Sequence, residues 1–251
     1  MRNAWTIARR EYHRFFASPI AYVVAFVMLL TLGIMFAVTI LYFRQNALGG
    51  GYGAPPAPDM SGITGTFAFL LILMLPALTM RLVSDENRMG TMELLLTAPI
   101  RDWELIVGKW LGGLLYMLTL MASTLVYAFV LNALETPGLD QSQLMTSYLG
   151  LILVTASLLA IGVGVSSMFS NQIAAFFVTL AVFVFLWWLV GFPASYVGAG
   201  GGFFSYLDMK THFYDSLNQG VINLSDVVYF ISLTALGLFA GSTAVEVRRW
   251  G

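Results

Sequence analysis

The chain has 251 residues, of which 59% are hydrophobic and only 10% are charged, with a formal net charge of −1. Soluble domains carry about 25% charged residues, so this composition excludes a water-soluble globular protein. The chain has no cysteine, which excludes disulfides and thiolate metal sites. The net charge gives no indication of nucleic acid binding, and we expect no nucleic-acid partner.

Residues 1–16 are predicted to form an interfacial amphipathic helix that lies along the inner leaflet against membrane lipids. On a helical wheel one face is mostly apolar and the other polar. The apolar face holds Trp5, Ala8, Tyr12, Phe15 and Phe16, and the polar face holds Asn3, Thr6, Arg10, His13 and Arg14. We expect His13 to contact lipid headgroups rather than a metal. A cationic anchor that only fixes topology is the alternative.

Six apolar segments approach or exceed the roughly 20 residues that a helix needs to cross a bilayer. They lie near residues 18–43, 62–81, 105–132, 144–169, 171–190 and 225–247. Backbone polar groups have no water partners inside the hydrocarbon, so helices are the expected structure. The predicted fold class is therefore an all-α integral membrane protein with a single transmembrane domain over residues 1–251.

The distribution of basic residues predicts the orientation of the chain. If the N-terminus is cytoplasmic, ten of the twelve basic residues lie on the cytoplasmic side, and only Arg44 and Lys210 lie outside. Cytoplasmic loops carry an excess of lysine and arginine. The sequence therefore predicts a multi-pass protein of the bacterial plasma (inner) membrane with both termini in the cytoplasm.

The charged connection, residues 82–103, links the second and third spans and is predicted to be cytoplasmic. Ser84 is expected to cap a short helix, Gly90 to interrupt it, Thr91 to cap a second amphipathic helix, and Asp102 to cap the third span. A helix that presents leucines and alternating charges suits docking into a groove of a partner protein. A solvated loop is the alternative, but it would leave several leucines exposed.

Other features indicate packing and bending. Pro76 in the second span is a candidate hinge, because proline removes a backbone donor.

The outer segment, residues 191–224, is rich in glycine yet apolar, so part of it is expected to re-enter the outer leaflet as broken helices. An ordinary apolar loop is the alternative. Small residues four apart favour close helix packing, which we expect mostly within one protomer, with packing between two protomers as the alternative: Gly108 and Gly112; Ala156, Ala160 and Gly164; Gly237 and Gly241.

Motifs that carry chemistry are missing from the sequence. The pair Gly108-Lys109 is followed by tryptophan, so it does not form a phosphate-binding loop. Ionisable residues do not fall at the middle of any span, which argues against a proton or sodium relay. We therefore expect a chain that is not an enzyme and holds no cofactor or metal of its own.

Several motifs resemble a known family. The segments ENRMGTMELLLTAPI (residues 86–100) and WELIVGKW (residues 103–110), with the six spans, resemble the type-2 ABC transporter permease family. FFASPI (15–20), PALTMR (76–81) and QGVINLSDVVYF (219–230) are similar to its gliding-motility permease branch.

This resemblance implies a half-transporter in which two permeases each dock a separate cytoplasmic ABC ATPase, which would hold ATP and Mg. The family's coupling helix would fall on residues 84–97. The implied ATPase-coupling interface comprises Asp85, Glu86, Arg88, Gly90, Thr91, Met92, Glu93, Leu95 and Leu96. The second permease would be another copy of this chain or a related subunit with a large extracytoplasmic domain.

The sequence thus predicts an ATP-driven exporter subunit that couples ATP hydrolysis in a partner to movement of a substrate. The alternative is ATP-driven mechanical signalling to an envelope partner, with no cargo transported. A polar lining between subunits would favour transport, and Thr119, Ser123, Thr124 and Asn132 could supply it. A membrane-embedded enzyme is a third option, but no catalytic constellation supports it.

Overall fold

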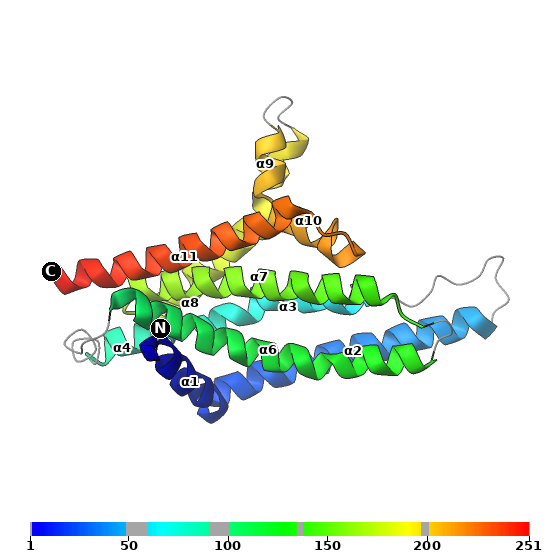
Figure 1. The fold of residues 1–251 in the computed structure, drawn as a ribbon, viewed down its shortest axis with the longest axis horizontal. Coiled ribbons are helices and arrows are strands. Elements are labelled where there is room, and N and C mark those ends of the chain that lie inside the picture. The colour runs from blue at the N-terminus through cyan, green and yellow to red at the C-terminus, as the bar shows by residue number, and fades with distance from the viewer. Residues whose placement is uncertain (1, 49–59, 91–100, 135–137, 197–200, 251) are drawn as a thin grey trace.

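The computed structural model is an all-α bundle and describes residues 2–48, 60–90, 101–134, 138–196 and 201–250 (Figure 1). These residues contain no strand. The α-helices are α1 (Arg2–Ala17), α2 (Pro19–Leu48), α3 (Ser61–Thr79), α4 (Ser84–Arg88), α6 (Asp102–Leu134), α7 (Gln141–Met168), α8 (Gln172–Val184), α9 (Gly201–Leu207), α10 (Met209–Tyr214) and α11 (Leu224–Trp250). A π-helix, η1 (Phe185–Leu189), and two 3₁₀-helices, η2 (Phe192–Ser195) and η3 (Leu217–Gln219), complete the described elements.

Within the described residues, six helical segments are long and apolar enough to cross a membrane, as predicted. They are Pro19–Gln45, Ser61–Glu86, Asp102–Leu134, Gln141–Met168, Gln172–Leu189 and Leu224–Val247. Each begins and ends within a few residues of its predicted span. The agreement is expected, because hydropathy reports directly on the length of helix that hydrocarbon can accommodate.

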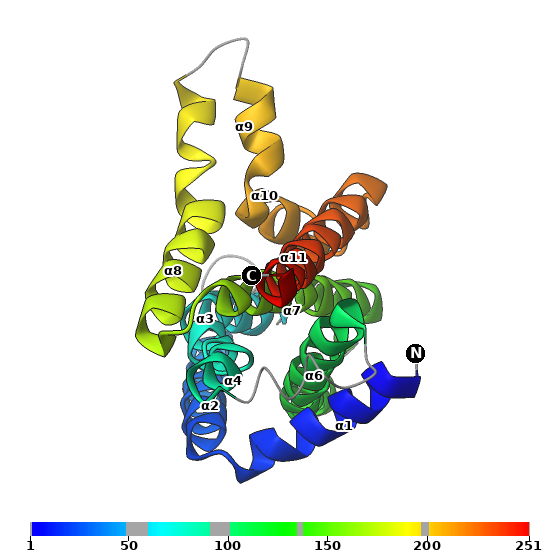
Figure 2. The same cartoon turned by 90° about the vertical axis from the view of Figure 1, so that its left-hand side faces the viewer.

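Helix α7 lies at the centre of the bundle, with α3, α6, α8 and α11 around it (Figure 2). Its closest neighbour is α11, and glycines make the approach possible. A Cβ atom at Gly164 would lie 2.7 Å from the carbonyl oxygen of Gly237, and one at Gly237 would lie 2.6 Å from the carbonyl carbon of Ala160. The small-residue spacing in these two spans therefore serves packing within one protomer.

Helix α1 lies across α6 near the end of the bundle that also holds α4 and the end of α11 (Figures 1 and 2). It crosses at Gly108 and Gly112, where added Cβ atoms would lie 2.7 Å from the Cβ atoms of Ile7 and Glu11. The buried face of α1 consists of Ala4, Ala8, Glu11 and Phe15. It thus shares two residues with the predicted apolar face, while Trp5 and Phe16 are exposed.

The predicted outer segment folds as short helical pieces. Helices α8, η1 and η2 run into an arm that projects from the bundle, and α9 returns beside them (Figures 1 and 2). Within residues 191–224 the described pieces are η2, α9, α10 and η3, and Gly220 ends η3 with a φ of 90°. Their position relative to a membrane stays a prediction, as does the hinge role of Pro76, which lies buried in the last turn of α3.

Polar contacts fasten this outer segment to the start of α3 and the start of α11. The His212 ring lies between α9 and α11: its Nδ1 is 2.7 Å from Asp226 Oδ1 and its Nε2 is 2.7 Å from the carbonyl oxygen of Tyr206. His212 also stacks on Tyr229, with ring centroids 4.2 Å apart. The Tyr214 hydroxyl donates to the carbonyl oxygen of Gly65 on α3 at 2.7 Å. These contacts hold the base of the arm against the bundle.

Candidate functional site at the charged connection

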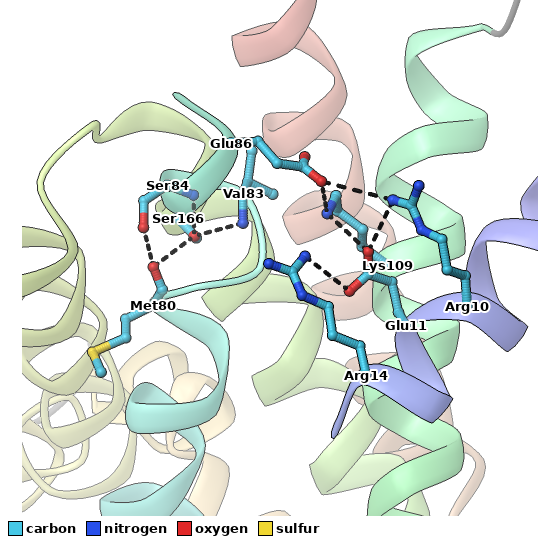
Figure 3. Close-up of polar contacts among 9 residues, drawn as sticks. All are labelled: Arg10, Glu11, Arg14, Met80, Val83, Ser84, Glu86, Lys109 and Ser166. Atoms are coloured by element: carbon cyan, nitrogen blue, oxygen red, sulfur yellow. Dashed lines mark hydrogen bonds and ion pairs between the residues drawn. The ribbon is translucent and has the colours of Figure 1, made fainter. Parts of the chain in front are cut away.

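Helix α4 is the described part of the charged connection, and a serine of another helix caps it. The Oγ atom of Ser166 on α7 accepts hydrogen bonds from the backbone N–H groups of Val83 and Ser84, at 3.3 and 3.2 Å, and donates to the carbonyl oxygen of Met80 at 3.3 Å (Figure 3). The prediction that Ser84 caps this helix is wrong. Its hydroxyl instead donates to the Met80 carbonyl oxygen, and Val83 occupies the cap position.

The ends of α4 match the helix dipole. Asp85 and Glu86 lie in its first turn and Arg88 in its last, which is the arrangement that the macrodipole favours. The predicted interruption at Gly90 is confirmed: α4 ends at Arg88, and Gly90 has a φ of 68°, a left-handed conformation that glycine adopts without steric cost.

The Lys109 cluster (Glu11, Glu86, Lys109, Arg10 and Arg14) joins α4 to α1 and α6. Lys109 on α6 is fully buried, and its Nζ lies 2.8 Å from Glu86 Oε1 and 3.3 Å from Glu11 Oε1 (Figure 3). Both carboxylates are themselves nearly buried. An ionisable residue inside a membrane-spanning segment is costly unless it is paired, and it often marks a functional position. One ammonium group therefore connects three helices that are distant in sequence.

Two arginines of α1 cover this cluster from the solvent side. Arg10 Nη2 lies 3.3 Å from Glu11 Oε1 and 3.9 Å from Glu86 Oε1, and Arg14 Nη1 lies 3.7 Å from Glu11 Oε2. Both guanidinium side chains are about half exposed. The buried part thus holds two carboxylates against one ammonium, and the arginines supply the remaining positive charge from the surface.

Helix α4 also contacts the start of α8. The Gln172 side chain donates from Nε2 to Asp85 Oδ1. Asn171 caps α8 by accepting from the backbone N–H of Ile173 at 2.9 Å. Through Ser166 and Gln172, α4 is therefore bonded to two helices on the side away from Lys109.

The start of α6 differs in detail from the prediction. Asp102 is the first residue of the helix rather than its cap. Glu104 Oε2 accepts from the backbone N–H of Arg101 at 3.2 Å, which is half of a capping box, and from Asn3 Nδ2 of α1 at 3.1 Å. This bond is a second link between α1 and the helix that follows the charged connection.

The implied interface residues divide into two groups. The structure describes the first group: Asp85, Glu86, Arg88 and Gly90. In this group, Asp85 is bonded to Gln172 and Glu86 to Lys109. Thr91, Met92, Glu93, Leu95 and Leu96 lie outside the described residues. Contact of either group with an ATPase stays a prediction.

Sequence reasoning missed Glu11, Lys109 and Ser166. Glu11 is the only acidic residue of α1, and Lys109 is the only lysine in the first 209 residues. These two lone charges are 98 residues apart, so they could have suggested the pair only if the two helices were already known to meet. Nothing in the sequence distinguishes Ser166 from Ser167, whose hydroxyl bonds the Gly164 carbonyl oxygen of its own helix.

The four polar residues proposed to line a path have mixed positions. Thr119, Ser123 and Asn132 are exposed on α6, whereas Thr124 is buried and its hydroxyl lies 2.8 Å from the Tyr148 hydroxyl of α7. Thr119 Oγ1 lies 3.1 Å from the Tyr12 hydroxyl of α1. Three of the four therefore lie on the surface of the described bundle, but Thr119 is bonded to α1 and Asn132 accepts from the backbone N–H of Leu139.

The cavity beside the Lys109 cluster is small in the part of the chain that the structure describes. A cavity of about 100 Å³ lies between α1, α3 and α4, lined in part by Arg14, Arg81 and Asp85. Pockets for ligands of cofactor size hold about 300–1,000 Å³. Among the residues that the structure describes, no group of three or more histidine, aspartate or glutamate side chains is placed to hold a metal ion.

Comparison with known proteins gives one family. The model of the family described as ABC-2 family transporter protein matches residues 5–247, nearly the whole chain. No curated protein matches the chain.

Proposed function

Because the chain belongs to the ABC-2 transporter family and is a membrane permease subunit, we propose that it is the membrane part of an ATP-driven exporter of the gliding-motility branch. A separate cytoplasmic ABC ATPase, which holds ATP and Mg, binds the charged connection. Its nucleotide-dependent movement shifts α4, and the permease converts this shift into opening of a substrate path. The chemistry belongs to the partner, and this chain supplies the conformational change.

The observation that carries this proposal is the way α4 is bonded. Lys109 joins it to α6 and, through Glu11, to α1. Ser166 joins it to α7, and Gln172 to α8. A helix bonded to three others directly and to a fourth through Lys109 cannot move without moving some of them or breaking those bonds. A force applied at the charged connection therefore has direct routes into three spans and the N-terminal helix.

The arrangement of charge supports a cytoplasmic position for this end of the bundle. The start of α1, α4 and the end of α11 lie at the same end (Figure 1). The basic residues Arg9, Arg10, Arg14, Arg81, Arg88, Arg101 and Lys109 belong to these elements or their neighbours. Placed in the inner membrane of a bacterium, this orientation satisfies the positive-inside rule and exposes the charged connection to a cytoplasmic ATPase.

A second permease completes the transporter in this proposal. Helices α2, α8 and α11 expose large apolar side chains, among them Phe26, Ile34, Leu41, Phe177 and Phe239. Such surfaces face either lipid or another membrane protein. We propose that part of them meets a second copy of this chain or a related subunit with a large extracytoplasmic domain.

The test uses the assembled complex in lipid, with ATP hydrolysis and transport measured together. Arg88→Glu reverses an exposed charge at the end of α4 and should lower ATPase binding and transport. Gly90→Pro should do so more strongly, because proline cannot adopt a φ near 68°. Arg44→Glu is the matched control, because it reverses an exposed charge near the C-terminal end of α2. Wild-type coupling in both the Arg88 and the Gly90 variant would overturn the proposal.

Mechanical signalling is the second candidate, and the projecting arm favours it. The arm exposes Phe192, Tyr196 and Phe203, and exposed aromatic side chains are typical of protein interfaces. An envelope partner could bind there. Vesicles that hydrolyse ATP but move no candidate amphiphile, in the presence of a partner that binds the arm, would favour this function over export.

A further inference from the structure

A groove between α1 and α6 has no role in the function proposed above. Its volume is about 550 Å³, and it lies on the side of α1 away from the Lys109 cluster. Four residues of each helix line it: Trp5, Arg9, Tyr12 and His13 from α1, and Leu115, Leu118, Thr119 and Ala122 from α6. The bond between Tyr12 and Thr119 connects its two walls. The groove is therefore a formed feature of the fold.

The two walls differ in chemistry. The α1 wall carries two basic side chains, Arg9 and His13, and both are exposed. The α6 wall is apolar apart from one hydroxyl, and from Leu115 to Ala122 it extends about 10 Å along the helix axis at about 1.5 Å per residue. None of the eight lining residues is acidic. The nearest acid on α1, Glu11, is held on the opposite side by Lys109.

The position of the groove decides what can occupy it. Residues 115–122 belong to a helix that can span the membrane, so the occupant must present an apolar body along α6. The same occupant must present a negative charge to Arg9 and His13. Trp5 is 58% exposed at the mouth, and tryptophan favours the boundary between hydrocarbon and headgroups. These requirements together describe an anionic phospholipid of the surrounding leaflet.

We propose that this groove is a binding site for one anionic phospholipid. Its phosphate binds between Arg9 and His13, and an acyl chain lies along Leu115, Leu118 and Ala122. The site holds α1 against α6 from the side opposite the Lys109 cluster. It does not depend on an ATPase or on a cargo, so it can be tested on the chain apart from transport.

The test is native mass spectrometry of the full chain in detergent, equilibrated with equal amounts of phosphatidylglycerol and phosphatidylcholine that have the same acyl chains. We expect the wild type to retain phosphatidylglycerol over phosphatidylcholine by about tenfold or more, because each basic residue near anionic lipid adds attraction. Arg9→Gln combined with His13→Gln should abolish the preference. Ala122→Trp should fill the apolar part and remove bound lipid of both kinds.

Arg44→Gln, which removes an exposed cation outside the groove, should keep the full preference and serves as the matched control. A photoreactive group introduced at Ala122 in the otherwise unchanged chain gives an independent result should the double variant fail to fold. Cross-links to phosphatidylglycerol would support the site. An unchanged preference in the folded double variant, or cross-links from position 122 to a second copy of the chain, would overturn it.

Discussion

Two buried ionic contacts lie toward opposite ends of the bundle, and they differ in what they join. The Lys109 cluster connects α4 with α1 and α6, and its partners are 98 and 23 residues away from Lys109. The pair of His212 and Asp226 connects two elements only 14 residues apart. The first contact holds together parts that the proposed function requires to move, and the second fixes the base of the arm.

The two contacts also differ in how their charge is balanced. In the Lys109 cluster, half-exposed arginines complete the balance, so water reaches one side of it. The His212 ring has acceptors at both nitrogens, because the Tyr206 carbonyl can only accept. The side chains of His212 and Asp226 are only 8% and 6% exposed, so this pair is more closed to water than the arginine side of the Lys109 cluster. We infer that the cluster near α4 can rearrange, whereas the pair at the arm stays closed.

Removing Lys109 should have the largest effect. Lys109→Met leaves Glu11 and Glu86 buried without their ammonium, and breaking a buried ion pair costs about 3–5 kcal/mol. We expect a large drop in the thermal unfolding midpoint of the purified chain and loss of ATPase coupling in the complex. The double variant Lys109→Met with Glu86→Gln should recover part of the stability. Additive losses in the double variant would show that the two side chains do not depend on each other.

Replacing His212 should cost less and leave coupling intact. His212→Phe keeps the stacking on Tyr229 but removes the ring nitrogen from Asp226, which retains its bond from Asn223, with an expected cost of about 2–3 kcal/mol. Hydrogen exchange should increase in α9 and α10, while ATP-coupled activity stays near that of the wild type. Lys210→Gln, on an exposed side chain of the same helix α10, is the control for stability. Loss of coupling in His212→Phe without loss of α1–α6 packing would contradict the division between the two regions.

The comparison shows what the sequence could and could not predict. The six spans followed from hydropathy, and the interruption of the short helix followed from the glycine at position 90. The partners of Lys109 did not follow, because they depend on α1 crossing α6 at Gly108 and Gly112. Sequence patterns such as hydropathy and capping residues predict only the structure of the nearby chain. The crossing of two helices 100 residues apart is set by packing.

The caps illustrate the same limit. Ser84 and Asp102 have side chains that cap helices, yet Val83 and Arg101 hold the cap positions, and the N–H groups there find acceptors in Ser166 and Glu104. For α6 the acceptor is three residues after the cap and follows a known motif, so the sequence contained a signal. For α4 the acceptor is 82 residues away. Only the packing of α7 beside the charged connection supplies it.

Ser166 offers a smaller test of the region near α4. Ser166→Ala removes the acceptor for two buried backbone N–H groups and should cost about 1–2 kcal/mol. The neighbouring Ser167→Ala is the matched control, because its hydroxyl bonds only its own helix. We expect the first variant, but not the second, to increase hydrogen exchange at Val83 and Ser84. Equal protection in both variants would exclude the capping role.

Tyr214 gives the smallest expected effect, at the base of the arm. Burial raises the pKa of the Tyr214 hydroxyl above its ordinary value, so the group stays a donor to Gly65 at neutral pH. Tyr214→Phe removes that single bond and should cost about 0.5–1.5 kcal/mol, seen as a small shift of the unfolding midpoint. Tyr196→Phe, on an 80% exposed ring of the arm, should shift it by less. A loss as large as that of His212→Phe would mean that the contact between α10 and α3, rather than the ionic pair, holds the arm in place.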